Sequence, residues 1–319
     1  MDVLTTPPLP LAEWLSIVER EYLSEYVPAG GAAVKFAVLD DDDATATAAE
    51  RLVGLGQARG MLTVQLEAGR TRIHLMQELF FAIARALPWD SLVQRYLEVL
   101  FGAHAYPWPR PGEPMTMTDL AGAFAVAPNL LSHHVDQWLT ADLWDDRRLT
   151  QDFRAALLRL CLSRLESDEW DTDHPAMLWL RGEKPAPASL RAADISVRIT
   201  RTNARAMLAS LCHFLRKAGA AGLLVVLDVR QLARTEAANG ALRYSPAAVM
   251  DAYEVLREII DDAEHLPSLF VAVLADAALA TGDPRRALGQ YAALQMRVWP
   301  DVRPGDRQNP VAPLVWLAP

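Results

Sequence analysis

Short apolar runs that alternate with amphipathic segments constrain the fold of this 319-residue chain more than any other feature. The clearest run is residues 222–228, in which five leucines and valines end in Asp228. Runs of this length that are rich in β-branched residues are typical of strands buried on both faces of a parallel sheet. Similar runs occupy residues 33–39, 61–66, 269–274 and 314–317. The chain is therefore expected to contain a five-stranded parallel sheet.

Segments with apolar residues at helical spacing lie between these runs. Near the two ends of the chain they cover residues 11–26, 44–59, 73–87 and 246–263. Ser245 and Pro246 suit the N-cap and the first position of the last of these helices. Strands that alternate with helices in this way predict an α/β fold.

The middle of the chain follows a different pattern. Between residues 89 and 218 we find no convincing strand, only helical periodicity and proline-rich turns, with candidate helices at residues 119–127, 129–140, 150–165 and 204–218. The sequence thus predicts an α/β core in two parts, residues 1–88 and 219–319. A large all-helical insertion, residues 89–218, separates them.

Composition excludes several classes of protein. The chain is 51% hydrophobic and 22% charged, as globular proteins are. Its net charge of −9 argues against a surface that binds nucleic acid throughout, but leaves room for a local basic groove. With only Cys161 and Cys212, a disulfide framework and a four-cysteine zinc site are excluded. We see no secretory signal and no run of about 18 apolar residues, so we expect a cytoplasmic protein that does not contact membranes.

Several segments of the second half resemble a known family. Residues 199–208, 222–228, 253–261, 291–297 and 309–313 are similar to the ATP-binding proteins of BREX-type phage-defence systems (BrxD-like). That family consists of AAA-like P-loop ATPases, so the resemblance implies an AAA-like P-loop core with a five-stranded parallel sheet. It also implies a Walker-B-like role for Asp228, which would contact the Mg²⁺ of a bound nucleotide.

The first strand departs from the family at the position of the phosphate loop. A P-loop needs glycines and a lysine, because backbone N–H groups and one ammonium cradle the phosphates. Here Asp40, Asp41, Asp42 and Asp43 follow the strand, and residues 39–47 contain neither glycine nor lysine. Like charges ~4 Å apart repel by about 4 kcal/mol at an effective dielectric of 20. Several such repulsions exceed the 0.3–1 kcal/mol or so that a helix dipole supplies.

A second departure follows Asp228, where Val229 replaces the glutamate that would polarise the attacking water. Both departures predict a degenerate, non-hydrolysing P-loop ATPase-like protein with no cofactor. Such a protein would act as a protein-interaction or regulatory subunit, beside an intact homologous ATPase of the same defence system. Two alternatives remain open: an AAA-like subunit that binds and hydrolyses ATP·Mg²⁺ through an atypical phosphate loop, and a nucleic-acid-binding adaptor.

The four aspartates themselves allow three interpretations. They can cap the helix that follows, since acids in a first turn complement the positive end of the helix. They can form a docking site for a partner's arginines. With Glu67 they can also form a magnesium or calcium site, because both ions prefer oxygen ligands.

Two groups of arginines are further candidates. Arg198, Arg201 and Arg205 would share one face if their segment were helical, and could then track a phosphate backbone. Arg243, Arg257 and Arg297 stand where the resembling family carries arginines, which implies an interface or arginine-finger-like role. Ion-paired or fold-stabilising arginines are the alternative in both cases.

The remaining candidates favour structural roles. His133 and His134 point to different faces of a helix, and the i+4 neighbour of His133 is Gln137, so no metal site is expected there. Cys161 and Cys212 lie on apolar helix faces and are expected to be core thiols. Large, amphipathic tryptophans suit the core of the insertion or an interface anchor; four lie there, Trp138, Trp144, Trp170 and Trp179.

Overall fold

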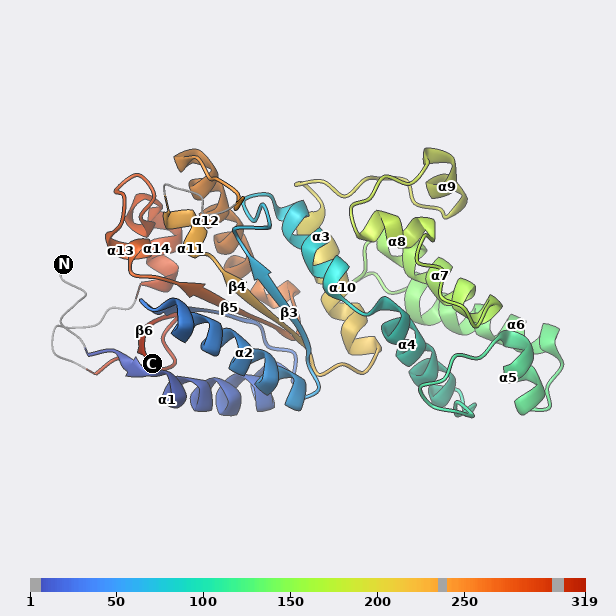
Figure 1. Ribbon diagram of the computed structural model, residues 1–319. Coiled ribbons are helices and arrows are strands. Elements are labelled where there is room, and N and C mark those ends of the chain that lie inside the picture. The colour runs from blue at the N-terminus through green and yellow to red at the C-terminus, as the bar shows by residue number, and fades with distance from the viewer. Residues whose placement is uncertain (1–6, 235–239, 300–306) are drawn as a thin grey trace. The chain divides into compact units, whose positions relative to one another are not determined.

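The strands of the described residues form one parallel sheet (Figure 1). The structure is a computed structural model that describes residues 7–234, 240–299 and 307–319. The sheet has six strands in the order β1-β6-β2-β5-β4-β3, and each adjacent pair is parallel. The strands are β1 (Leu9–Pro10), β2 (Ala33–Val38), β3 (Leu62–Glu67), β4 (Leu223–Asp228), β5 (Leu269–Ala275) and β6 (Leu314–Ala318).

All five apolar runs are strands, as predicted, but the expected number of strands is wrong. The additional strand, β1, has two residues and pairs with β6 alone. A strand this short has no periodicity to detect. Its second residue, Pro10, is tolerated because an edge strand leaves one side of its backbone unpaired.

Helices cover both faces of the sheet. On one face lie α1 (Leu11–Ile17), the π-helix η2 (Val18–Tyr26) and α2 (Asp42–Ala58), which bury a continuous apolar core against β2, β4, β5 and β6. On the other face Figure 1 shows α12 (Pro246–Asp261), α13 (Ala278–Thr281) and α14 (Ala292–Val298). Burial on both faces explains why the central strands are apolar throughout.

Three short helices lie between these elements along the chain. They are α11 (Arg230–Ala233) after β4, η4 (Ala263–His265) before β5, and η5 (Leu288–Gln290) between α13 and α14. Helix α3 (Met76–Ala86) follows β3.

The chain divides into two compact units, one made of Met1–Ile83 and Ala221–Pro319, the other of Ala84–Ala220. The first contains the sheet. The second, all of whose residues the structure describes, contains helices and no strand. The domain limits drawn from the sequence at residues 88 and 218 stay a prediction.

The helical unit is built around aromatic side chains. Its helices are α4 (Trp89–Ala103), α5 (Met117–Ala123), α6 (Pro128–Leu139), the π-helix η3 (Thr140–Trp144), α7 (Gln151–Glu166), α8 (Pro175–Leu180), α9 (Pro187–Ala192) and α10 (Ala204–Lys217). Trp89, Tyr96 and Phe214 are fully buried, and the ring of Phe214 packs against both others. Across the described residues of both units, no helix has the length and apolarity needed to cross a membrane.

Candidate functional site

Acidic side chains gather where the parallel strands end. Asp40 to Asp43 follow β2, Glu67 ends β3, Asp228 ends β4 and Asp276 follows β5. Because the strands are parallel, their carboxyl ends share one edge of the sheet, where ligands of open α/β folds bind. This edge is therefore the candidate site of the first unit.

The start of α2 carries out the capping predicted for the aspartates. Asp41 is the N-cap residue, and its side chain accepts a hydrogen bond from the backbone N–H of Asp43 at 3.1 Å. Asp40 accepts from the backbone N–H of Ala277 at 3.1 Å, which links the end of β2 to the segment after β5. The capping interpretation is confirmed at Asp41, whose carboxylate takes up an N–H group that could otherwise face an anion.

Arg230 lies at the centre of the site. Its Nε donates to both carboxylate oxygens of Asp228, at 3.0 and 3.1 Å, and its Nη2 donates to Asp228 at 2.6 Å. Its Nη1 donates to Asp42, in the first turn of α2, and Arg234 reaches the same Asp42 oxygen at 3.3 Å. The guanidinium thus joins the end of β4 to the start of α2.

This pairing has an electrostatic consequence. The hydrogen bonds to Asp228 raise the pKa of Arg230 above its usual value. Burial raises the pKa of the nearby Asp276 carboxyl, and the positive charges of Arg234 and Arg230 oppose that rise. The side chain of Arg230 is only 17% exposed and that of Asp228 21% exposed, so water screens the pair less than a surface ion pair.

A small pocket of about 210 Å³ lies beside this pair, between α2 and strands β3 and β4. It is lined by Thr45, Ala46, Ala49, Gln65, Glu67, Val226, Asp228, Arg230 and Leu274. Pockets for drug-sized ligands usually measure about 300–1,000 Å³. The pocket is therefore smaller than a typical pocket for a drug-sized ligand.

Comparison with protein families matches residues 127–319, more than half of the chain, to the family described as BREX system ATP-binding protein BrxC/D. The chain belongs to this family. The resemblance inferred from the sequence is thereby confirmed. Comparisons with curated proteins and with solved structures give no match.

The range of the family match bears on the site. It includes the end of β4 with Asp228 and Arg230, and the segment after β5. It does not include β2 or residues 39–47, where the sequence analysis expected a phosphate loop. The half of the candidate site that the start of α2 forms therefore lies outside the matched range.

Two of the arginines singled out from the resemblance to the BrxC/D family form ion pairs with acids of α12. Arg257 donates to both carboxylate oxygens of Glu254, at 2.8 and 2.6 Å, and also to Asp261, all within α12. Arg297 of α14 donates to the same Asp261, at 2.8 Å through Nη2. The third, Arg243, is exposed. Their interface role stays a prediction.

The segment that carries Arg198, Arg201 and Arg205 is not helical throughout, so the condition for one shared helix face is not met. Helix α10 begins at Ala204, so only Arg205 is helical, although all three side chains are exposed. Asn203 explains the boundary: its Oδ1 accepts from the backbone N–H of Thr200 at 2.7 Å, and its Nδ2 donates to the carbonyl of Arg198 at 3.0 Å. These bonds fold the segment into turns, which compete with a helix.

The two cysteines are buried, as predicted, whereas the expected lack of a metal site at His133 and His134 stays a prediction. His133 and Gln137 are hydrogen-bonded at 3.1 Å, and among the described residues no cluster of three potential metal ligands exists. Cys161 and Cys212 are buried, unpaired thiols, and burial raises the pKa of Cys212 to about 12. Burial thus disfavours the thiolate, which is the nucleophilic form of a cysteine.

Sequence reasoning missed Arg230, Arg234 and Asp276. The signal for Asp276 was available, because it follows a predicted strand as Asp228 ends one. Arg230 carried no such signal: one arginine two residues beyond an acid is unremarkable until the sheet brings α2 beside it.

Proposed function

We propose that this BrxC/D-family chain is a degenerate, non-hydrolysing protein of P-loop type that acts as a protein-interaction subunit of a BREX anti-phage system. The observation that carries the proposal is the pairing of Arg230 with Asp228 and Asp42. Asp228 stands where the resemblance implies a Walker-B-like aspartate, and Asp42 stands where it implies a phosphate loop.

The metal half of a nucleotide site is replaced. In P-loop enzymes the aspartate after this strand helps to hold Mg²⁺. Here both oxygens of Asp228 accept hydrogen bonds from Arg230, which supplies the positive charge in place of the ion. A magnesium ion would have to displace a bidentate, poorly exposed guanidinium, and bidentate pairs are the stronger kind of ion pair.

The phosphate half is replaced as well. The first turn of α2 offers carboxylates where a phosphate needs N–H groups and a lysine. Of its aspartates, Asp42 is 75% exposed, so its charge faces any approaching anion. Arg230 and Arg234 already neutralise this charge in part, and no lysine stands in residues 39–47.

If the chain does not hydrolyse nucleotide, its function depends on the surfaces that the fold presents to a partner. The sheet, its two helical layers and the separate helical unit offer surfaces for a partner, for which we favour an intact ATPase of the same system. The role in defence follows from membership of the BrxC/D family.

A second function, ATP binding without a standard phosphate loop, is favoured by the family's description as ATP-binding proteins. It requires Arg230 to leave Asp228 when ATP·Mg²⁺ binds. The two functions differ in what Asp228 does, because it either holds an arginine or holds a metal ion.

Release of phosphate from ATP tests the proposal. The purified chain and its Asp228→Ala variant are incubated with ATP and Mg²⁺, and inorganic phosphate is measured over time. We expect the same background rate for both proteins. Turnover by the wild type that the substitution abolishes would overturn the non-hydrolysing assignment.

A further inference from the structure

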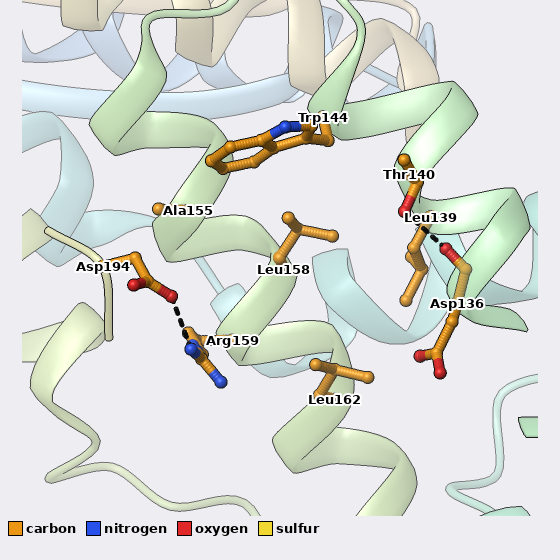
Figure 2. A pocket seen from close by; sticks show the side chains of 9 residues that line it. All are labelled: Asp136, Leu139, Thr140, Trp144, Ala155, Leu158, Arg159, Leu162 and Asp194. Atoms are coloured by element: carbon orange, nitrogen blue, oxygen red, sulfur yellow. Dashed lines mark hydrogen bonds and ion pairs between the residues drawn. The ribbon is translucent and has the colours of Figure 1, made fainter. Parts of the chain in front are cut away.

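A hollow of about 500 Å³ lies on the surface of the helical unit, beside the start of α7. It is lined by Trp144, Gln151, Arg191, Asp194, Ile195 and Ser196. Trp144 and Asp194 also line a neighbouring groove of about 290 Å³, which Figure 2 shows. Apart from Asp194, the polar side chains of the hollow are a guanidinium, an amide and a hydroxyl, which can all donate hydrogen bonds.

Trp144 presents a fixed aromatic surface to the hollow. It ends the π-helix η3 and is 37% exposed. The guanidinium of Arg154 lies 5.4 Å from the centre of the indole ring and donates a hydrogen bond to the carbonyl of the same tryptophan. Exposed aromatic rings are surfaces on which nucleobases stack, and such stacking does not depend on the base sequence.

The segment between α9 and α10 is fixed beside the hollow. Buried Asp152 accepts hydrogen bonds from the backbone N–H groups of Ser196 and Val197, at 2.5 and 3.2 Å. Trp179 donates from its indole N–H to the carbonyl of Val197 at 2.9 Å. The exposed side chain of Arg198 follows directly, two residues beyond Ser196 in the lining.

The acids around the hollow already have partners. Asp194 forms an ion pair with Arg159 at 2.5 Å (Figure 2). Asp146, in the turn before α7, pairs with Arg148 at 2.8 Å and with Lys217 at 3.2 Å. These negative charges are therefore compensated within the helical unit.

The cations next to the hollow have no acidic partner. They are Arg191 in the lining, Arg154 against the indole ring and Arg198, and within the described part of the chain none of them forms an ion pair. The Nε of Arg154 is also buried without a hydrogen-bond partner. Asp145 and Arg147, both exposed in the turn after η3, balance each other in charge. The uncompensated charge around the hollow is therefore positive.

The sequence around the hollow has the same imbalance. Residues 184–205 contain five cations and one acid, Asp194, although the whole chain has a net charge of −9. Asp136 lines the neighbouring groove but not the hollow. A local excess of one charge attracts ligands of the opposite charge. The hollow thus fits a polyanion.

Among polyanions, a single-stranded nucleic acid also fits the aromatic surface. Its phosphates follow one another along a flexible backbone, and its unpaired bases are free to stack on an exposed ring. A duplex keeps its bases stacked inside, and an acidic peptide has no base to stack.

We propose that this hollow binds single-stranded nucleic acid, with a base stacked on the indole of Trp144 and the adjoining phosphates bound by Arg191 and Arg198. This site goes beyond the interaction role proposed above and does not depend on it. The phosphates supply the negative charge that the arginines lack within the chain, and the stacked base covers the exposed ring.

Binding of fluorescently labelled oligonucleotides to the full chain tests this proposal. Anisotropy gives Kd values for short oligo(dT) and oligo(rU) strands and for a duplex of the same length, at several salt concentrations. The variants are Trp144→Ala, Trp144→Phe, Arg191→Gln, Arg198→Gln and the control Arg110→Gln. Arg110 is another exposed arginine of the helical unit, but it pairs with Glu113 at 2.9 Å and does not line the hollow.

Both single strands are expected to bind more tightly than the duplex. Trp144→Ala weakens binding of the single strands about tenfold, and Trp144→Phe weakens it less, because a smaller ring still stacks. Arg191→Gln and Arg198→Gln each reduce the slope of log affinity against log salt by about 0.7, the contribution of one phosphate contact in a single strand. Arg110→Gln changes neither the Kd nor the slope. Circular dichroism confirms that each variant is folded.

Other results overturn the proposal. They are no binding of either single strand at low salt, equally tight binding of the duplex, and binding that Trp144→Ala does not affect. If Arg110→Gln weakens binding as much as Arg191→Gln, the strand is attracted by the general charge of the helical unit and not by the hollow. None of these measurements involves ATP hydrolysis, so failure here is distinguishable from failure of the phosphate-release test.

Discussion

Arg230 joins two carboxylates that come from different elements of the fold, Asp228 at the end of β4 and Asp42 in the first turn of α2. The two carboxylates differ in environment, since the Asp228 side chain is 21% exposed and that of Asp42 is 75% exposed. Water can replace the partner of an exposed charge but not of a buried one. The contribution of the guanidinium to stability is therefore concentrated in its bonds to Asp228.

Neutralising each carboxylate in turn tests this difference. Asp228→Asn is expected to lower the free energy of unfolding by about 1–3 kcal/mol, because hydrogen bonds to charged groups contribute that much. Asp42→Asn is its matched control and should cost less than about 1 kcal/mol. Urea denaturation in a metal-free buffer measures both. Equal, negligible effects would show that Arg230 is not held as the structure has it.

Lys35 offers a test of burial on β2. Its side chain donates to the carbonyl of Val311 at 2.6 Å and lies 4.7 Å from the centre of the Tyr22 ring. Burial lowers the pKa of this ammonium from 10.5 to about 8. The folded state thus binds the proton less tightly than the unfolded state, which destabilises the fold by about 3 kcal/mol below pH 8.

The free energy of unfolding is therefore expected to rise with pH above about 8. As pH rises from about 8 to 10.5, the folded state releases the proton first, and the destabilisation by Lys35 disappears. We expect Lys35→Met to stabilise the protein by about 2 kcal/mol at pH 7 and by progressively less above pH 8. Thermal melts of both proteins between pH 7 and pH 10 measure the difference. A difference that is independent of pH would contradict the burial of a charged lysine.

At the scale of elements, the start of α2 determines what the sheet edge can bind. Asp41 caps the helix and Asp43 lies in its first turn with an exposed side chain. Capping by an aspartate contributes about 1 kcal/mol, whereas an exposed acid near a helix N-terminus contributes about 0.3–1 kcal/mol. The acids that follow β2 thus serve helix stability.

Alanine substitution separates the cap from the general effect of charge. Asp41→Ala is expected to cost about 1–2 kcal/mol of unfolding free energy, and Asp43→Ala clearly less. Chemical denaturation with circular dichroism detection compares the two variants. If Asp43→Ala proves the more damaging one, the cap has been assigned to the wrong residue.

Sequence patterns were most informative where an element is long and buried. The five apolar runs are strands, and the central strands β4 and β5 are buried along nearly their whole length. Four short helices, α8, α9, α11 and α13, were not predicted, because four to six residues are too few for helical periodicity. Helix α4, with fifteen residues, was not predicted either, although its spacing of Val93, Leu97 and Leu100 carried the signal.

For each ion pair of the candidate site, the sequence identified only one of the two residues. The aspartates at the strand ends were visible in the sequence, since acids follow apolar runs. Their partners were not, because Arg230 and Asp42 are 188 positions apart and meet only through the sheet. Trp144 was expected in the core or at an interface, and its exposure could not be read from its neighbours in the sequence.

At the scale of the whole molecule, the two hollows described above lie in different compact units. The unit with the sheet contains the pocket beside Asp228 and Arg230, and the helical unit contains the hollow beside Trp144. The family match spans parts of both units but not residues 39–47. Under the proposed function, such a chain keeps an interaction surface while its nucleotide site changes.

Equilibrium binding of ATP in the presence of Mg²⁺ tests the central claim most directly. Isothermal titration calorimetry is performed on the full chain and on Asp228→Ala. The account predicts no binding at millimolar ATP for either protein, because the site holds Arg230 and exposes carboxylates to the phosphates. A sub-millimolar Kd for the wild type that Asp228→Ala weakens would contradict it.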